Sequence, residues 1–81
     1  MSIRWIRNVA VDGRPSTLEV MLGWAKIADK CYIRVGNEDE FWFRPGADNR
    51  ESVLEQGLAL LRHKLLGKQV TTPAGSPYPW N

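Results

Sequence analysis

The sequence has few of the residues on which catalytic sites and disulfide-stabilised domains depend. It contains one cysteine and one histidine among 81 residues, so an internal disulfide is excluded and a Cys/His zinc site lacks its ligands. A glycine-rich phosphate loop is also missing. Cys31 falls on the apolar side of a predicted strand, as inert buried thiols do, and His63 lies near a basic helix end. We therefore predict a non-enzymatic protein without a cofactor or a metal ion.

Long apolar runs are missing as well. No stretch approaches the roughly 20 apolar residues of a membrane span, and the mean hydropathy is −0.36. Arg4 and Arg7 interrupt the N-terminal segment, which argues against the apolar core of a signal peptide. The hydrophobic share of 43% and the charged share of 25% are typical of a globular protein. These features predict a single cytoplasmic domain without membrane contact.

The sequence also has no sustained stretch of one charge sign. The net charge of +2 combines a balance of +3 over residues 1–36, −4 over residues 37–55 and +3 over residues 56–81. Nucleic-acid-binding proteins usually carry a continuous basic stripe. Because an acidic middle separates two basic ends, the charge pattern makes nucleic acid the less favoured partner.

Residues 16–28 admit two interpretations. Ser16 and Glu19 form the S-x-x-E capping box of a helix N-terminus, and the apolar residues that follow recur at helical spacing. The same residues also alternate between apolar and other side chains, and Asp12-Gly13 would close a strand hairpin. The capping box and the alanines of the second half favour a helix.

The rest of the chain has clearer patterns. Residues 3–11 alternate as a strand, and residues 31–35 and 40–44 predict a hairpin with a hydrophilic turn. Residues 48–66 have the apolar stripe of a helix, which Asp48 can cap.

Together these elements predict an α+β fold. Its small antiparallel sheet has three to four strands, two helices pack on one face, and the order is β-α-β-β-α. Residues 1–67 form the domain, and residues 68–81 form a Pro-rich extended tail with an optional short edge strand at 68–72.

The alternation within the hairpin predicts a face that the helices leave uncovered. Odd-numbered residues point at the helices, and even-numbered ones point to the other face, where Arg4 and Ile6 join them. Aromatic rings and guanidinium groups are enriched at binding hot spots, although cross-strand pairs of the same residues also stabilise a sheet without any partner. The partner-binding residues predicted on this face are Tyr32, Arg34, Trp42 and Arg44.

Two further segments are candidates for partner contact. Glu38, Asp39 and Glu40 form an acidic hairpin tip that either borders the contact face or is a solvated turn. Tyr78 and Trp80 lie in the Pro-rich tail, which acts either as a linear recognition element or as a lid on an undersized core.

The leading hypothesis is a small protein-binding module that acts by stoichiometric contact. An accessory or inhibitor protein of a phage or mobile element is one class that fits it. The first alternative is a nucleic-acid-binding protein that stacks bases on the Arg/aromatic face. The second is a subunit of a homo-oligomer in which this face meets its own copy.

Overall fold

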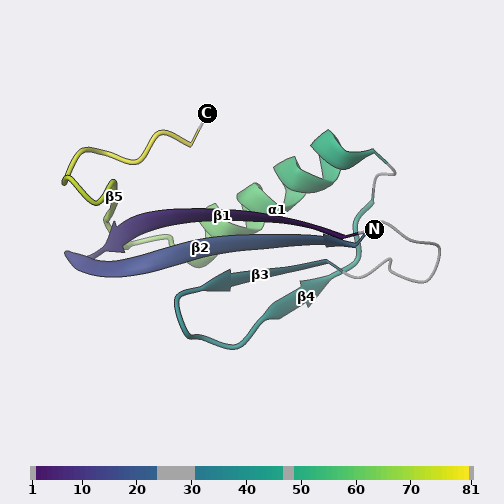
Figure 1. The fold of residues 1–81 in the computed structure, drawn as a ribbon, viewed down its shortest axis with the longest axis horizontal. Helices are drawn as coiled ribbons and strands as arrows, with labels where there is room; N and C mark the ends of the chain where they lie inside the picture. The colour runs from purple at the N-terminus through teal and green to yellow at the C-terminus, as the bar shows by residue number, and fades with distance from the viewer. Residues whose placement is uncertain (1, 24–30, 47–48, 81) are drawn as a thin grey trace.

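The computed structural model describes residues 2–23, 31–46 and 49–80, with the side chains described from Arg4 onward. These residues form a five-stranded antiparallel sheet and one helix (Figure 1). The sheet order is β4-β3-β2-β1-β5. The elements are β1 (Ser2–Val11), β2 (Arg14–Gly23), β3 (Cys31–Val35), β4 (Phe41–Phe43), α1 (Arg50–Lys64) and β5 (Val70–Thr71). The predicted sheet of three to four strands with two helices is therefore wrong, and the protein is mostly β.

The error lies in residues 16–28. Residues 16–23 belong to β2 and not to a helix, and residues 24–28 lie outside the described part of the chain. Asp12 and Gly13 have φ values of 51° and 80°, which suit the two-residue turn of a β-hairpin. Because this turn aligns β2 with β1 over ten residue pairs and β3 pairs along its other edge, strand pairing outweighs the local capping box.

The other predicted elements are confirmed. β3 and β4 pair as an antiparallel hairpin, with Tyr32 opposite Trp42. The predicted helix is α1, and the side chain of Asn49 caps it by accepting a hydrogen bond from the Ser52 N–H at 2.9 Å. The predicted cap Asp48 lies outside the described residues.

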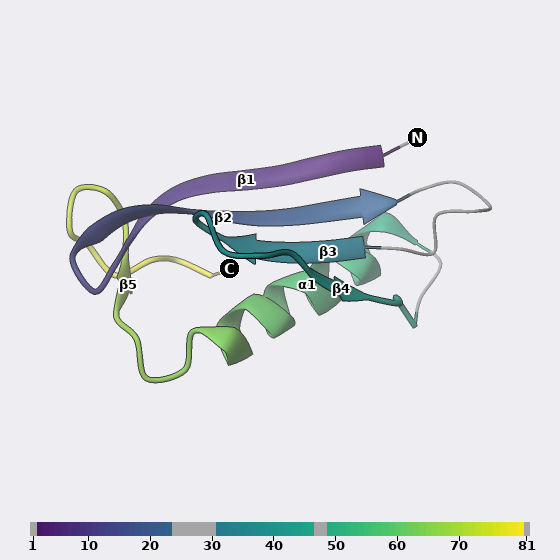
Figure 2. The same ribbon diagram turned by 90° about the horizontal axis from the view of Figure 1, so that it is seen from below.

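α1 covers one face of the sheet over β2 and β3 (Figure 2). The core between them is aliphatic, with inward side chains from the three central strands and from α1. Gly57 is buried against β2, where its lack of a side chain lets the helix approach Val20. The core side chains are Val9, Leu18, Val20, Leu22, Cys31, Ile33, Val35, Val53, Leu61 and Leu65.

The C-terminal segment folds back onto the same side of the sheet as α1 (Figures 1 and 2). β5 pairs with Ala10 and Val11 at the end of β1, and a turn follows in which the Thr72 N–H donates to the Ser76 carbonyl at 2.7 Å. Tyr78 and Trp80 then pack, partly buried, against the core. Residues 68–80 thus contribute one strand and two aromatic side chains to the domain.

Candidate partner-binding face

The sheet face opposite α1 has no layer over it among the described residues; we call it the open face. Directly paired residues on neighbouring strands share a face, so the strand register defines its membership. One row runs Arg4, Met21, Tyr32, Trp42, and a second runs Ile6, Glu19, Arg34. The even-numbered positions of β3 and β4 therefore lie together on this face with Arg4 and Ile6, whereas α1 covers the odd-numbered positions of β3.

Two aromatic rings pack together at the β4 edge of the open face. The ring centroids of Tyr32 and Trp42 are 5.0 Å apart, with a tilt of 59° between the ring planes, and the Arg34 guanidinium lies 5.8 Å from the Tyr32 centroid. Tyr32 is only 7% exposed, whereas Trp42 is 55% exposed. Tyr32 therefore supports the pair from within the sheet, and Trp42 presents the apolar surface.

A buried carboxylate organises the charges of the open face. Glu19 is 4% exposed and lies between two arginines: its Oε2 is 2.9 Å from Nε of Arg4, and its Oε1 is 2.6 Å from NH2 of Arg34. The contact at Oε1 is an ion pair without good hydrogen-bond alignment. Arg34 also donates to Oε1 of Glu40 at 3.3 Å. The two guanidinium groups are thus held in fixed positions.

Glu19 is the residue that the sequence interpretation missed. The S-x-x-E pattern predicts a capping box for Glu19 and so conceals its place on a strand beside Arg4 and Arg34. The sequence does contain a sign of this role, because Glu19 is the only charged residue between Thr17 and Gly23. If the segment is a strand, Glu19 lies on the face away from Leu18, Val20 and Leu22.

The side chains of the acidic hairpin tip contact opposite faces of the sheet. Glu40 joins the open face through Arg34, whereas Oε1 of Glu38 lies 3.2 Å from Nζ of Lys64 on α1. Asp39 is exposed at the turn between them, and Arg44 is exposed just beyond β4. The structure therefore brings Glu40 to the predicted site and directs Glu38 away from it.

Tyr78 and Trp80 lie on the covered side, away from the open face. Their rings meet edge to face at 4.9 Å, and the Arg62 guanidinium lies 5.8 Å from the Trp80 centroid. Burial raises the pKa of the Tyr78 hydroxyl above its ordinary value of 10.0, while the nearby charge of Arg7 acts in the opposite sense. Their surroundings are those of a lid on the core.

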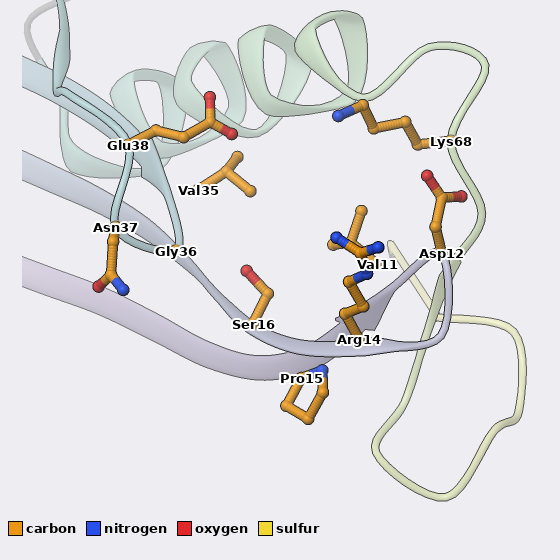
Figure 3. A pocket seen from close by; sticks show the side chains of 10 residues that line it. All are labelled: Val11, Asp12, Arg14, Pro15, Ser16, Val35, Gly36, Asn37, Glu38 and Lys68. Carbon is orange, nitrogen blue, oxygen red and sulfur yellow. The ribbon is translucent and has the colours of Figure 1, made fainter.

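An open hollow of about 510 Å³ lies at one end of the sheet, beside the β1–β2 turn (Figure 3). Glu38 and Lys68 face it from different segments, and Asp12 and Arg14 complete a lining of mixed charge. Asp12 is already engaged, since its Oδ1 accepts from the Gln69 N–H at 2.9 Å. This mixed lining favours neither an anion nor a cation.

Other kinds of site receive no support from the described residues. They contain no cluster of three or more potential metal ligands, Cys31 is buried and unpaired, and His63 is exposed on α1. Within the same ranges, no helix combines the length and apolar character of a transmembrane segment.

The comparisons with known proteins give no further guide to function. No protein-family model matches the chain, and neither a curated protein nor a solved structure is significantly similar to it. Any statement about function therefore depends on the geometry of the open face.

Proposed function

We propose that the protein is a small non-enzymatic binding module that docks another protein on the open face. The observation that carries this proposal is Trp42, a large aromatic side chain that is 55% exposed yet packed on the nearly buried ring of Tyr32. An exposed side chain that is already fixed loses little conformational entropy when a partner covers it. Tryptophan is also among the residues most enriched at binding hot spots.

The charges around Trp42 indicate what kind of surface the partner presents. Arg4 and Arg34 are oriented by Glu19, but their side chains remain 53% and 34% exposed. Each guanidinium has five N–H donors, so donors remain for a partner after the contacts with Glu19 are made. A protein surface with an apolar pocket for Trp42, bordered by carbonyl oxygens, fits this arrangement.

Stoichiometric docking of this kind is how a small accessory or inhibitor protein of a phage or mobile element would act. No chemical step is needed, because occupying the partner's surface is itself the activity. This assignment of biological class rests on the size and composition of the chain, and it is a narrower proposal than protein binding itself.

Nucleic-acid binding is the weaker alternative. Base stacking on Trp42 is geometrically open, but Glu19 and Glu40 already neutralise the guanidiniums that would meet phosphate groups. Phosphate-driven affinity falls steeply as salt rises. We therefore expect a short oligonucleotide not to quench the tryptophan fluorescence at low or high salt; salt-sensitive quenching that Trp42→Ala removes would favour the alternative instead.

The main test compares two variants that each lose one exposed apolar side chain. Affinity capture from the native host is performed with the parent protein, with Trp42→Ala and with Leu66→Ala, the control, because Leu66 is 71% exposed and lies beyond the end of α1. We expect the parent and Leu66→Ala to capture a host protein that Trp42→Ala does not capture. The affinity of this purified partner should be equal for the parent and Leu66→Ala and lower for Trp42→Ala.

A melting curve completes this test. Trp42→Ala removes one cross-strand aromatic pair, which contributes roughly 0.2–1 kcal/mol, so its melting temperature should fall by only a few degrees. Equal retention by all three proteins contradicts the proposal. A large loss of melting temperature in Trp42→Ala would instead mark this side chain as part of the core.

A further inference from the structure

The outer edge of β1 is open over most of its length. β5 spans two residues and pairs with β1 only at Ala10 and Val11. Within the ranges that the structure describes, no strand lies beside residues 2–9 on the side away from β2 (Figure 2). β5 extends the sheet beside Ala10 and Val11 and is bridged in turn by Pro77, and the segment that ends at Trp80 then runs on the α1 side of the sheet (Figure 2). Natural proteins usually protect an exposed edge of this length, because it can pair with another strand.

The peptide groups that face this edge follow from the hairpin geometry. Val11 and Arg14 flank a two-residue turn and form a hydrogen-bonded pair. Because bonding direction alternates along a strand, the peptide N–H and C=O groups of Arg4, Ile6 and Asn8 point away from β2. The Arg7 guanidinium donates to the Ile6 carbonyl at 2.8 Å, which agrees with a carbonyl that points away from β2.

We propose that β1 pairs with β1 of a second copy, antiparallel about a two-fold axis at Ile6. In this register Ile6, which is 43% exposed, faces the partner's Ile6. Arg4 faces the partner's Asn8 and Arg7 faces the partner's Trp5, so no arginine meets another. The Arg7–Ile6 hydrogen bond is exchanged for a bond between the strands.

Registers centred on an arginine or on Asn8 are less favourable. An axis at Arg4 or at Arg7 would set that arginine directly against its own copy, which is destabilising. An axis at Asn8 would set the partner's Ile6 and Trp5 against Ala10 and Val11, which β5 already occupies, whereas an axis at Ile6 brings only the partner's Ser2 to Ala10. Self-pairing about Ile6 is therefore compatible with both the charges and the length of the open edge.

The dimer would be one continuous sheet with both helices on one side and both open faces on the other. This follows from an antiparallel pair whose two-fold axis is perpendicular to the sheet. Its contacts involve the edge of β1, whereas the docking proposed above centres on Trp42 near the opposite edge. Arg4 borders both surfaces, but Ile6→Lys and Trp42→Ala separate the two proposals.

The test measures mass against concentration, from micromolar to millimolar protein, by analytical ultracentrifugation. We expect the mass to rise from the 9.2 kDa of one chain toward twice that value. Ile6→Lys places two like charges across the axis, so it should remain at the mass of one chain where the parent is dimeric. Trp42→Ala is the matched control and should dimerise like the parent.

Amide hydrogen exchange identifies which strand edge pairs. The amide protons of Arg4, Ile6 and Asn8 should exchange more slowly as concentration rises in the parent, and rapidly at every concentration in Ile6→Lys. A monomer throughout the range overturns the proposal. A dimer that Trp42→Ala dissociates also overturns it, since this outcome assigns the interface to the open face. A dimer in which amide exchange slows in β4 and not in β1 overturns it too, since it assigns the interface to the opposite edge.

Discussion

The face of the sheet beneath α1, the covered face, buries aliphatic side chains from β2 and β3. The open face carries an ion-pair network and a tilted aromatic pair. Both faces contain buried side chains: Leu18 and Val20 are covered by α1, while Glu19 between them is covered by its neighbours on the sheet. One alternating strand thus supplies two surfaces with different physical roles.

This difference separates stability from recognition. The covered face depends on close packing, where a change of one methyl group is felt. The open face depends on directional contacts between side chains that keep part of their surface in water. We therefore expect substitutions on the covered face to change the free energy of unfolding most, and substitutions at the rim of the open face to change it least.

The largest loss of stability is expected from Gly57→Ala, where α1 contacts the covered face. A Cβ at this position would lie 2.5 Å from Cγ1 of Val20, so α1 or β2 must shift. Alanine favours the helix by about 1 kcal/mol over glycine, but overpacking at so short a separation should cost about 3 kcal/mol or more, so we expect a net loss of at least about 2 kcal/mol. Thermal unfolding followed by circular dichroism should show a melting temperature several degrees lower.

A double variant tests the stated cause of that loss. Val20→Ala removes the methyl groups that the new Cβ would meet, so Gly57→Ala should cost less in the Val20→Ala background than in the parent. A rise in the melting temperature of the single variant would show that α1 has room to move away from the sheet.

A smaller loss is expected from Glu19→Gln on the open face. The substitution keeps the shape but removes the charge shared by Arg4 and Arg34. Because the carboxylate is buried and both arginines are partly exposed, the cost should be about 1–2 kcal/mol, between the values for exposed and buried ion pairs. Urea unfolding at low and high salt measures the free energy of unfolding of both proteins. The difference between Glu19→Gln and the parent should be smaller at high salt, because salt screens the ion pairs.

Glu40→Gln is the matched control for this variant. Glu40 contacts the same Arg34 but its side chain is 40% exposed, so its loss should change the free energy of unfolding by less than about 0.5 kcal/mol. Equal effects of the two substitutions would mean that burial of Glu19 does not strengthen its ion pairs. Buried Glu19 and exposed Glu40 would then contribute equally to stability.

The sequence predicts those parts of the molecule whose signals are local. The hairpin of β3 and β4 follows from alternation around a hydrophilic turn, and α1 follows from its apolar stripe. The alternation in β3 and β4 also predicts which side of the sheet Tyr32 and Trp42 occupy. Local patterns suffice there because each of these elements meets its partner across a short turn or along one face.

The remaining features depend on contacts that are distant in sequence. Glu19 satisfies a helix-capping pattern, and only its ion pairs with Arg4 and Arg34 reveal its role. The sharply different exposure of Tyr32 and Trp42 likewise depends on where β4 lies in the sheet, since an edge strand leaves one side of Trp42 without a neighbour. Alternation assigns a face, but it does not assign the depth of burial on that face.

The smallest predicted effect concerns pH and the C-terminal lid on the covered face. Because burial raises the pKa of Tyr78 above 10.0 in the folded protein, folding favours the neutral phenol. The stability that this phenol contributes is complete below about pH 10 and is lost as pH rises through the folded pKa. We expect the urea midpoint to fall between about pH 9 and pH 11 by slightly more in the parent than in Tyr78→Phe. All other side chains are common to the two proteins, so their contributions cancel in this comparison. An identical decline would mean that Tyr78 ionises as freely in the folded protein as in the unfolded one, and that the C-terminal segment is a looser cover than the helix beside it.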